Sequence, residues 1–361
     1  MINVKDYGTC GDGSTNDTAA IQKAIDAAAE RQETVYLPAG VYPVDGLSIH
    51  DYTGIQGDAG WSYLKPGGSV LRLTNPQAAC LLDWTSSRGS RITGVCLDGA
   101  RLGEGIHGLH MAHPKKRDAE DSCVIERCAF INFTGDGIRL DNVWCFNIRG
   151  CLSGRNIGDG INVQGGDGFI LDNQLSYNQG AGFRCDRASG SMMLTANRIE
   201  WNQGGGIVGA RAWHWQISGN YIDRSGGPGI WLHRNESHGC YDFIITGNVI
   251  HRSGRPAWTE DESMDCNVWL DSVHHSVFAN NSLTPGADDS GHGTTTPAVG
   301  IRLSRCGHLQ VVHNVVRSTG TPILSENNCE EEVVETMNTV KVVKKEIKPD
   351  APAHLNHSHM S

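Results

Sequence analysis

Hydrophobic and polar residues recur along much of the chain with a period of 22–24 residues. From residue 121 onward, an apolar residue is followed three positions later by asparagine or, in the first two repeats, by cysteine. A period of this length is typical of one coil of a β-solenoid, so we predict an all-β fold of about nine stacked coils. The second residue of each pair should join a buried ladder, in which side-chain amides bond to the next coil. The pairs are Ile125/Cys128, Ile148/Cys151, Ile170/Asn173, Leu194/Asn197, Ile217/Asn220, Ile245/Asn248, Phe278/Asn281 and Val311/Asn314.

A second pattern lies about ten residues further along each repeat, where apolar and polar residues alternate. It occupies 137–141, 160–164, 182–186, 206–208, 229–233, 267–271 and 300–304. Alternation places the apolar residues inside the solenoid and the others on the outer face of one sheet. The predicted outward residues form one stripe, which contains Arg139, Asp141, Asn162, Gln164, Arg184, Asp186, Trp231, His233, Trp269, Asp271 and Arg302.

This stripe predicts a binding surface, although a polar outer face is also the ordinary state of a solenoid. Outward tryptophans lose free energy in water unless something covers them. Their flat faces would suit sugar rings, and Arg184 and Arg302 would bind carboxylates or hydroxyl groups. The predicted substrate-binding residues are Arg139, Asp141, Asn162, Arg184, Trp231, Trp258, Trp269 and Arg302.

Two repeats are longer than the others, because they hold insertions at 253–266 and 284–297. Insertions in a solenoid form loops on one face, often the binding face. Both insertions fall between the asparagine ladder and the stripe, so we expect them to overhang it. They would bring acidic residues, Trp258 and His292 towards Trp231, His233 and Trp269.

Carboxylates beside aromatic residues suit the cleavage of glycosidic bonds. That reaction needs one carboxylic acid to protonate the leaving oxygen and a second carboxylate about 5–10 Å away. Neighbouring carboxylates in a partly desolvated groove shift each other's pKa values apart, which supplies an acid and a base at one pH. The candidate catalytic residues are Asp186, Asp271, Asp265, Glu260, Asp288 and His233, with the acid and base roles left open.

Two other interpretations of the insertions remain open at this stage. They are either acidic loops exposed to solvent or a calcium site, because clustered carboxylates suit a hard cation. The calcium ligands would be Glu260, Asp261, Asp265, Asp288 and Asp289. Without that ion, no cofactor is expected, and the histidines lack the spacing of a zinc site.

The N-terminal segment predicts a cap for the solenoid. Asp17 or Thr18 can begin a helix whose apolar stripe is Ile21, Ala24, Ile25 and Ala28, and a strand follows at 34–37. Such a unit would cover the apolar surface and unpaired backbone of the first coil. We therefore expect a cap at 1–45, a β-helix at 46–329, and a last strand with a disordered tail at 330–361.

The opening resembles a known superfamily. The string VKDYGxxGDGxxNDTAAIQKAIDAA, followed by VYLPAGVY, closely resembles the start of pectate-lyase-like β-helix proteins, which include polysaccharide lyases, glycoside hydrolases and phage tail-spike depolymerases. This resemblance implies a right-handed parallel β-helix, but the opening is shared by enzymes of different chemistry.

Residues 57–110 are loosely similar to inulin fructotransferases, which implies a carbohydrate substrate and a homotrimer. The Asp288–Gly293 string is similar to residues of polygalacturonases, but here they share one loop.

Composition limits the partners and the cellular location that we expect for the protein. The net charge of −10 argues against nucleic acid or an anionic membrane as a partner. No apolar run approaches the ~18–20 residues of a membrane span, and the first residues lack a signal-peptide core. We expect the 12 cysteines to be mostly reduced and buried, which fits a cytoplasmic protein. Cleavage of a leader before Met1 is left open.

The sequence thus predicts an enzyme that cleaves a poly- or oligosaccharide through carboxylate acid/base catalysis. One alternative is a polysaccharide lyase, in which an arginine or histidine removes the proton next to a uronate carboxylate, with Ca²⁺ as electrophile. A fructan transferase-type lyase is a variant of that alternative. A different class is a spike or adhesin module that binds glycan without catalysis.

Overall fold

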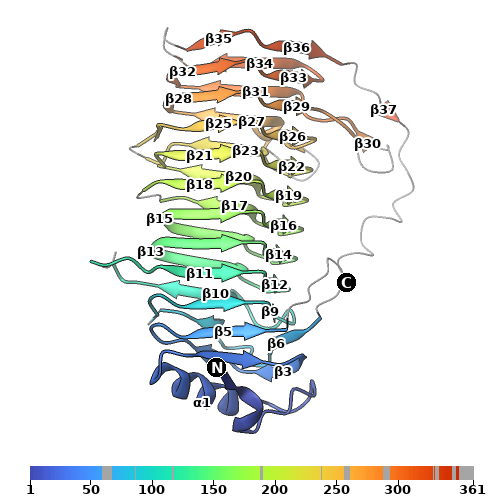
Figure 1. Cartoon of the computed structure of the whole chain (residues 1–361). Coiled ribbons are helices and arrows are strands. Elements are labelled where there is room, and N and C mark those ends of the chain that lie inside the picture. The colour runs from blue at the N-terminus through green and yellow to red at the C-terminus, as the bar shows by residue number, and fades with distance from the viewer. Residues whose placement is uncertain are drawn as a thin grey trace. The chain divides into compact units, whose positions relative to one another are not determined.

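The computed structural model describes residues 1–58, 67–85, 87–115, 118–187, 190–236, 238–255, 261–287, 293–327, 329, 333–343 and 347–348. The chain divides into two compact units, residues 1–198 and 199–361, and each is described by itself. In both units, successive coils stack so that each strand pairs in parallel with strands one coil away (Figure 1). This is the predicted parallel β-helix.

Each coil of the first unit contributes strands to three rows. Row 1 holds β4 (Leu47–Ser48), β7 (Cys80–Asp83), β10 (His107–Ala112), β13 (Ile138–Arg149), β15 (Ile161–Leu171) and β17 (Ala181–Cys185). Row 2 holds β1 (Ile2–Asn3), β2 (Thr34–Leu37), β5 (Gly54–Gly57), β8 (Arg91–Thr93), β11 (Cys123–Glu126), the second halves of β13 and β15, and β18 (Met192–Thr195). Row 3 holds β3 (Gly40–Val44), β6 (Ser69–Leu73), β9 (Val95–Asp98), β12 (Ala129–Ile131), β14 (Leu152–Gly154) and β16 (Gln174–Ser176).

The second unit repeats this arrangement. Its row 1 is β20 (Gly205–Ala210), β23 (Ile230–His233), β27 (Cys266–Asp271), β31 (Val299–Ser304) and β34 (Thr321–Glu326). Row 2 is β21 (Trp215–Ser218), β24 (Cys240–Tyr241), β25 (Ile244–Thr246), β28 (Val273–Ala279), β32 (Gly307–Val312) and β35 (Val334–Thr336). Row 3 is β22 (Tyr221–Asp223), β26 (Val249–His251), β29 (Ser282–Thr284), β33 (Val315–Ser318) and β36 (Thr339–Val342).

Four elements lie outside or across these rows. The boundary between the units falls within β19 (Arg198–Glu200). A short 3₁₀ helix, η3 (Glu262–Met264), lies in the first insertion. Strand β30 (Gly293–Thr294) in the second insertion pairs antiparallel with β37 (Ile347–Lys348). The predicted last strand at 330–348 is thus three short strands, and the tail beyond it lies outside the described residues.

The N-terminal helix follows the sequence prediction. After the 3₁₀ helix η1 (Val4–Tyr7), α1 runs from Thr18 to Ala29 and buries all four residues of its predicted stripe. Asp17 is the N-cap residue by position, but its carboxylate does not cap the helix. It accepts the N–H groups of Cys10 (2.7 Å) and Gly11 (2.9 Å) instead, which ties the preceding loop to the start of α1.

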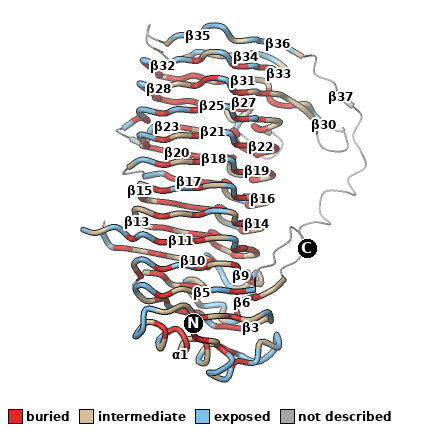
Figure 2. Tube along the Cα trace, viewed as in Figure 1, coloured by how far each residue is buried: buried red, intermediate tan, exposed pale blue. Residues whose placement is uncertain are grey.

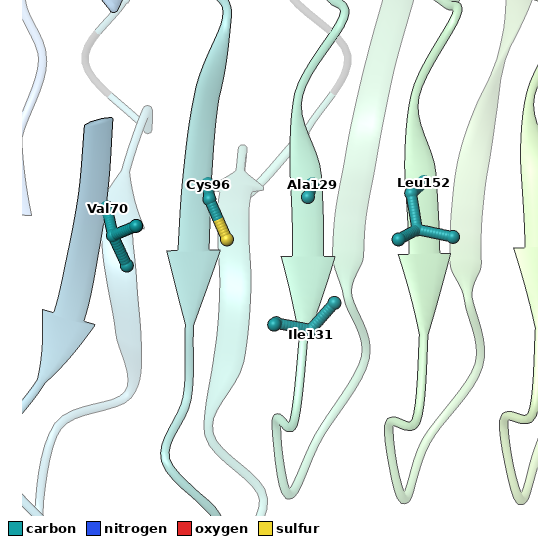
Figure 3. Packing of buried hydrophobic residues seen from close by; sticks show 5 residues of the cluster. All are labelled: Val70, Cys96, Ala129, Ile131 and Leu152. Carbon is teal, nitrogen blue, oxygen red and sulfur yellow. The ribbon is translucent and has the colours of Figure 1, made fainter. Parts of the chain in front are cut away.

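Alternation along each strand produces a closely packed interior. Figure 2 shows buried segments running along the strands of every coil, separated by half-buried and exposed positions. Five residues of the first unit form a smaller apolar cluster on β6, β9, β12 and β14 (Figure 3), namely Val70, Cys96, Ala129, Ile131 and Leu152. Each coil buries a few apolar side chains of this kind against the next coil. The stability of the solenoid is therefore a sum of contributions from neighbouring coils.

The predicted asparagine ladder is present in both units. Asn173 Nδ2 donates to Asn197 Oδ1 at 3.0 Å in the first unit. In the second unit, Asn248 Nδ2 donates to Asn281 Oδ1 at 2.9 Å, and that ladder continues to Asn338, which the repeat had not predicted. Paired amides in the interior satisfy each other and the neighbouring backbone, so burial costs them little.

All 12 cysteines lie in the described part of the chain and are free thiols, and most of them are buried as expected. Burial raises the pKa of Cys240 to about 11, so this thiol stays protonated at neutral pH. No helix among the described residues is long and apolar enough to cross a membrane.

Candidate active site

The first unit carries a group of charged and polar side chains on the outer face of row 1. We call it the charged cluster. Strand register sets its geometry, because His110 pairs with Arg139, Arg139 with Asn162, and Asn162 with Arg184 on four successive coils. The cluster consists of His107, His110, Asp136, Arg139, Asp141, Asp159, Asn162 and Arg184.

Asp136 and Asp159 occupy equivalent turns, each within a Gly-Asp-Gly segment just before a row 1 strand. One oxygen of each carboxylate joins neighbouring coils. Asp136 Oδ1 accepts the backbone N–H of Asp159 at 2.7 Å, and Asp159 Oδ1 accepts that of Ala181 at 2.6 Å. A side chain on Gly158 would collide with Asp136 Oδ1, so this close approach requires glycine there.

The second oxygen of each carboxylate contacts polar side chains on the outer face. Asp136 Oδ2 lies 3.2 Å from Arg139 Nη1. Asp159 Oδ2 accepts from Arg184 Nε and from Asn162 Nδ2, both at 2.9 Å. Each aspartate therefore links two coils through its first oxygen and takes part in the charged cluster through its second.

The two histidines are held in the same neutral tautomer, with the proton on Nε2, by different partners. His110 Nε2 lies 3.0 Å from Asp141 Oδ2, which also accepts from Arg139 Nε at 2.9 Å. A carboxylate only accepts, so neutral His110 carries its proton on Nε2 and has a lone pair on Nδ1. His107 Nδ1 accepts the backbone N–H of Asp136 at 2.9 Å, so neutral His107 carries its proton on Nε2 as a donor. The ring centroids lie 5.1 Å apart.

Burial and charge separate the pKa values within the cluster. Burial, together with the charges of His110 and Arg139, lowers the pKa of His107 to about 4. Burial raises the pKa of Asp159 to about 6, with a contribution from Asp136 and opposition from Arg184. Burial also acts to raise the pKa of Asp141, but hydrogen bonds from His110 and Arg139 outweigh it and hold the pKa below its usual value. Perturbed groups of this kind concentrate at functional sites.

The cluster remains open to a ligand. His107, His110 and Arg139 are 19%, 22% and 26% exposed, whereas the carboxyl groups of Asp136 and Asp159 are nearly covered. A site with exposed nitrogen donors and deeply set acids can bind an anionic group and exchange protons with it.

The sequence placed part of this site correctly. Arg139, Asp141 and Arg184 lie on the outer face as predicted, but Asn162 is covered by its neighbours and its amide is bonded to Asp159. Asp186 is 46% exposed at the edge, with its Oδ1 3.6 Å from Arg184 Nη1.

Four members of the cluster were missed by sequence reasoning, namely His107, His110, Asp136 and Asp159. The available signals were the repeated Gly-Asp-Gly ahead of an alternating segment, and His-Gly-Leu-His at 107–110. The latter falls before residue 121, where the alignment of the repeats began.

The second unit carries a stack of side chains on its own row 1. The indole rings of Trp231 and Trp269 are 5.7 Å apart and nearly parallel. His233 stacks on Trp231 at 4.4 Å, and the guanidinium of Arg302 lies 5.3 Å from the ring centre of Trp269. The expectation that flat tryptophan faces would receive sugar rings is wrong, because the faces are covered by each other, by His233 and by Arg302. The stack thus shields its own apolar surface.

Two carboxylates of the second unit that were predicted to be catalytic have protein partners. Asp271 is buried and accepts from Arg305 Nη2 at 2.6 Å, so its expected exposure on the outer stripe is corrected. Asp265 accepts the backbone N–H of Ala298 at 2.8 Å, which joins the first insertion to the residue that precedes β31. These contacts explain both acids without a substrate.

The remaining predicted residues lie in the insertions. Trp258, Glu260, Asp288, Asp289 and His292 lie outside the described residues. Asp261 is described, and the charge of Arg302 contributes to the lowering of its pKa after the larger effect of hydrogen bonds from Ser263. Within the described ranges, no three acidic, histidine or cysteine residues are grouped to hold a metal ion. Calcium at these loops remains a prediction.

The coil geometry and the charged outer face define a pectate-lyase-like β-helix protein. A family model described as "Rhamnogalacturonase A/epimerase, pectate lyase-like" matches residues 1–231, and a "Right handed beta helix region" model matches residues 181–347. The chain belongs to the rhamnogalacturonase A/epimerase, pectate lyase-like family. The predicted right-handed β-helix and the superfamily resemblance are thereby confirmed.

Known proteins with similar sequences or structures include enzymes of polysaccharides. Mannuronan C5-epimerase AlgE3 of Azotobacter vinelandii is 32% identical over 223 residues, which cover 57% of this chain and 12% of the epimerase. Alginate lyase 7 of the same organism is 62% identical over 45 residues, 12% of this chain and 5% of the lyase. A solved DFA-IIIase from Arthrobacter chlorophenolicus matches with a TM-score of 0.72 and 16% identity, covering 94% of this chain and 98% of that one. The chain thus spans a small part of the curated relatives.

Proposed function

We propose that this chain is a carbohydrate-active enzyme that removes the proton from carbon 5 of a uronate residue in a polysaccharide, at the charged cluster. The observation that carries the proposal is the contact between His110 Nε2 and Asp141 Oδ2 at 3.0 Å, beside two arginines. This contact positions His110 as a base that faces the cationic hydrogen-bond donors of the cluster.

His110 acts as the base in this proposal. Asp141 fixes the ring with its lone pair on Nδ1 and stabilises the imidazolium that forms, as the carboxylate does in an Asp-His pair of any acyl-transfer triad. The lowered pKa of Asp141 keeps that carboxylate charged throughout. Proton transfer to a positioned base contributes about 10²–10⁴-fold to such reactions.

Removal of the proton creates a negative charge on the substrate. Three side chains stabilise this charge, namely His107, Arg139 and Arg184. Loss of the proton moves negative charge onto the uronate carboxylate. Arg139 uses Nε and Nη1, and Arg184 uses Nε, in bonds to aspartates, and a guanidinium has five N–H donors, so each retains donors for a substrate. Neutral His107 adds an Nε2–H donor without competing for the proton, because its pKa is near 4.

Asp159 supplies the second proton. Its raised pKa keeps part of the population protonated near neutral pH. If the acid protonates the glycosidic oxygen, the bond from carbon 4 to oxygen breaks and the product is unsaturated. If a proton instead returns to carbon 5 from the opposite face, the product is the epimer. Neither route needs a further reactant.

The relatives support uronate chemistry over the hydrolysis that the sequence first favoured. Matching curated relatives are named as a mannuronan epimerase and an alginate lyase, and both names denote enzymes that act on uronate polymers. Hydrolysis is the second candidate, because Asp141 and Asp159 have pKa values shifted in opposite directions, as an acid/base pair requires. The acids first proposed for it, Asp265 and Asp271, accept protein hydrogen bonds, as Asp159 does, and their catalytic role stays a prediction.

The second unit carries a further candidate surface for an acidic sugar on its own row 1. Arg302 lies at one end of the aromatic stack, with Nε 3.7 Å from the carboxylate of Glu326, and it retains donors for a carboxylate.

The deciding experiment incubates the protein with mannuronan, other polyuronates and neutral glycans in deuterated water. Ultraviolet absorbance detects unsaturated ends, a reducing-end assay detects cleavage, and proton NMR detects deuterium at carbon 5. Deuterium incorporation or unsaturated ends on a polyuronate, lost in His110→Gln, supports the proposal. Reducing ends without unsaturation or deuterium would establish hydrolysis instead. Binding without any product would establish the glycan-binding module.

A further inference from the structure

A groove lies on the outer face of row 2 in the first unit, on strands that do not carry the charged cluster. It crosses β2, β5, β8 and β11, and it holds about 200 Å³. Gly54 pairs with Thr34 on one side and Arg91 on the other, and a side chain on Gly54 would collide with Thr34 Oγ1, which lies over that glycine. The lining residues are Thr34, Gly54, Ile55, Gln56, Arg91, Thr93, Glu126 and Arg127.

The groove is locally cationic although the whole chain has a net charge of −10. Glu126 is its only acidic lining residue, and Arg149 on the next coil neutralises it through bonds of 3.1 and 2.6 Å from Nε and Nη2 to Oε1. The guanidinium groups of Arg91 and Arg127 form neither hydrogen bonds nor ion pairs with other described residues. Two positive charges therefore face the groove without an intramolecular counter-charge.

The neutral polar groups of the groove are similarly available. The side chain of Gln56 is exposed and forms no hydrogen bond within the described ranges. Thr34 adds a hydroxyl group to the lining, whereas Thr93 Oγ1 is buried. In the charged cluster, by contrast, every carboxylate has a partner in the protein. A concave surface with two arginine forks, an amide and a hydroxyl suits a ligand that has both a carboxylate and hydroxyl groups.

We propose that this groove is a second binding site, separate from the charged cluster, for one acidic sugar unit. Arg91 and Arg127 would bind the carboxylate, while Gln56 and Thr34 would bind hydroxyl groups. Drug-sized pockets hold about 300–1,000 Å³, so a groove of this size fits a single sugar unit. The choice of a uronate as the ligand rests on the proposed function. The inference that the groove binds a carboxylate and hydroxyl groups rests on its lining residues alone.

The test is a calorimetric titration of the full chain with a monomeric hexuronate and, separately, with an oligouronate. We expect two binding sites in the wild type. In the double variant Arg91→Gln, Arg127→Gln, the affinity of one of these sites for the sugar acid should fall at least tenfold, so that this site is lost from the titration. Arg317→Gln, which changes an exposed arginine on β33 of the second unit, is the matched control and should retain both sites. Binding of the oligomer alone would identify a unit of the polymer as the ligand, and binding of the monomer would identify the free sugar acid.

The outcomes separate this proposal from the proposed function. If the charged cluster does not bind uronate, the wild type shows one site and the double variant shows none. If the double variant titrates like the wild type, or if chloride and inorganic phosphate compete as well as the sugar acid, the groove is not a sugar site. Activity on short substrates should be unchanged in the double variant, because neither arginine contacts the charged cluster.

Discussion

The carboxylate of Asp136 accepts the backbone N–H of Asp159, one coil further along the solenoid, at 2.7 Å. The same relationship follows one coil later, where Asp159 accepts the N–H of Ala181. Each bond fixes the carboxylate at a turn, so that the second oxygen is directed to the arginines of row 1. A structural bond between coils therefore also positions an acid in the candidate active site.

Replacement of Asp159 should separate these two roles. Asp159→Asn retains an oxygen for the N–H of Ala181 but can neither donate the carboxyl proton nor accept from Arg184 and Asn162 through its amide nitrogen. We therefore expect activity to fall by about 10²–10⁴-fold, with a smaller loss of stability than in the alanine variant. Asp159→Ala also leaves that N–H without a partner, which should cost about 1–3 kcal/mol of unfolding free energy. Rate measurements together with urea denaturation of both variants check this prediction. Equal activity of wild type and Asp159→Asn would remove the acid from the mechanism.

Disruption of the Asp141–His110 pair should remove the base. Asp141→Asn favours the wrong tautomer of His110, and a loss of about 10⁴-fold follows the behaviour of comparable Asp-His pairs. His110→Gln should cost as much, and the double variant no more, because the two residues act as a unit. Asp186→Asn is the control, since that carboxylate is half exposed at the edge of the cluster. Additive losses would show that the two residues act independently.

The pH dependence of stability should reveal two opposing titrations. Asp159 has a pKa of about 6 in the folded protein against about 3.9 unfolded, so its contribution to unfolding free energy falls as pH rises from about 4 to 6. His107 has a pKa of about 4 against about 6.5 unfolded, so its contribution rises with pH over about 4–6.5. The two contributions largely cancel in the wild type.

A variant that lacks one of the two groups should therefore show the pH dependence of unfolding free energy that the other group causes. Relative to wild type, unfolding free energy should increase with pH in Asp159→Asn and decrease with pH in His107→Gln, each by about 1 kcal/mol per pH unit. Urea denaturation between pH 4 and 6.5 measures both. Parallel curves for the three proteins would show that neither group titrates as the structure indicates.

Loss of the aromatic stack should destabilise the fold. Trp269→Ala removes a ring that contacts both Trp231 and Arg302. We expect about 0.5–1.5 kcal/mol less stability from the lost ring contacts. Urea denaturation measures this loss, and Tyr52→Ala, which removes an exposed aromatic side chain, is the control. Equal unfolding free energies of Trp269→Ala and wild type would show that the ring contacts do not stabilise the fold.

Removal of one ladder amide should destabilise the fold without a direct effect on the site. Asn248 donates to Asn281 Oδ1 and Ile217 O, and its own Oδ1 accepts the N–H of Asn220. Asn248→Ala leaves these buried groups unpaired, at about 1–3 kcal/mol each. Thermal denaturation compared with Val249→Ala, whose side chain is exposed, measures the difference.

The sequence alone determined the solenoid, the asparagine ladder, the N-terminal helix and the outward direction of Arg139, Asp141 and Arg184. These features follow from period and alternation, which are local and repeat in every coil. Only the tertiary structure decided which polar residues meet across coils. It placed His107 and His110 beside Asp136 and Asp141, set Asp159 against Arg184, and turned the tryptophan faces onto each other. The polar contacts join residues 25 to 31 positions apart, and their burial and charge set the pKa values of the cluster.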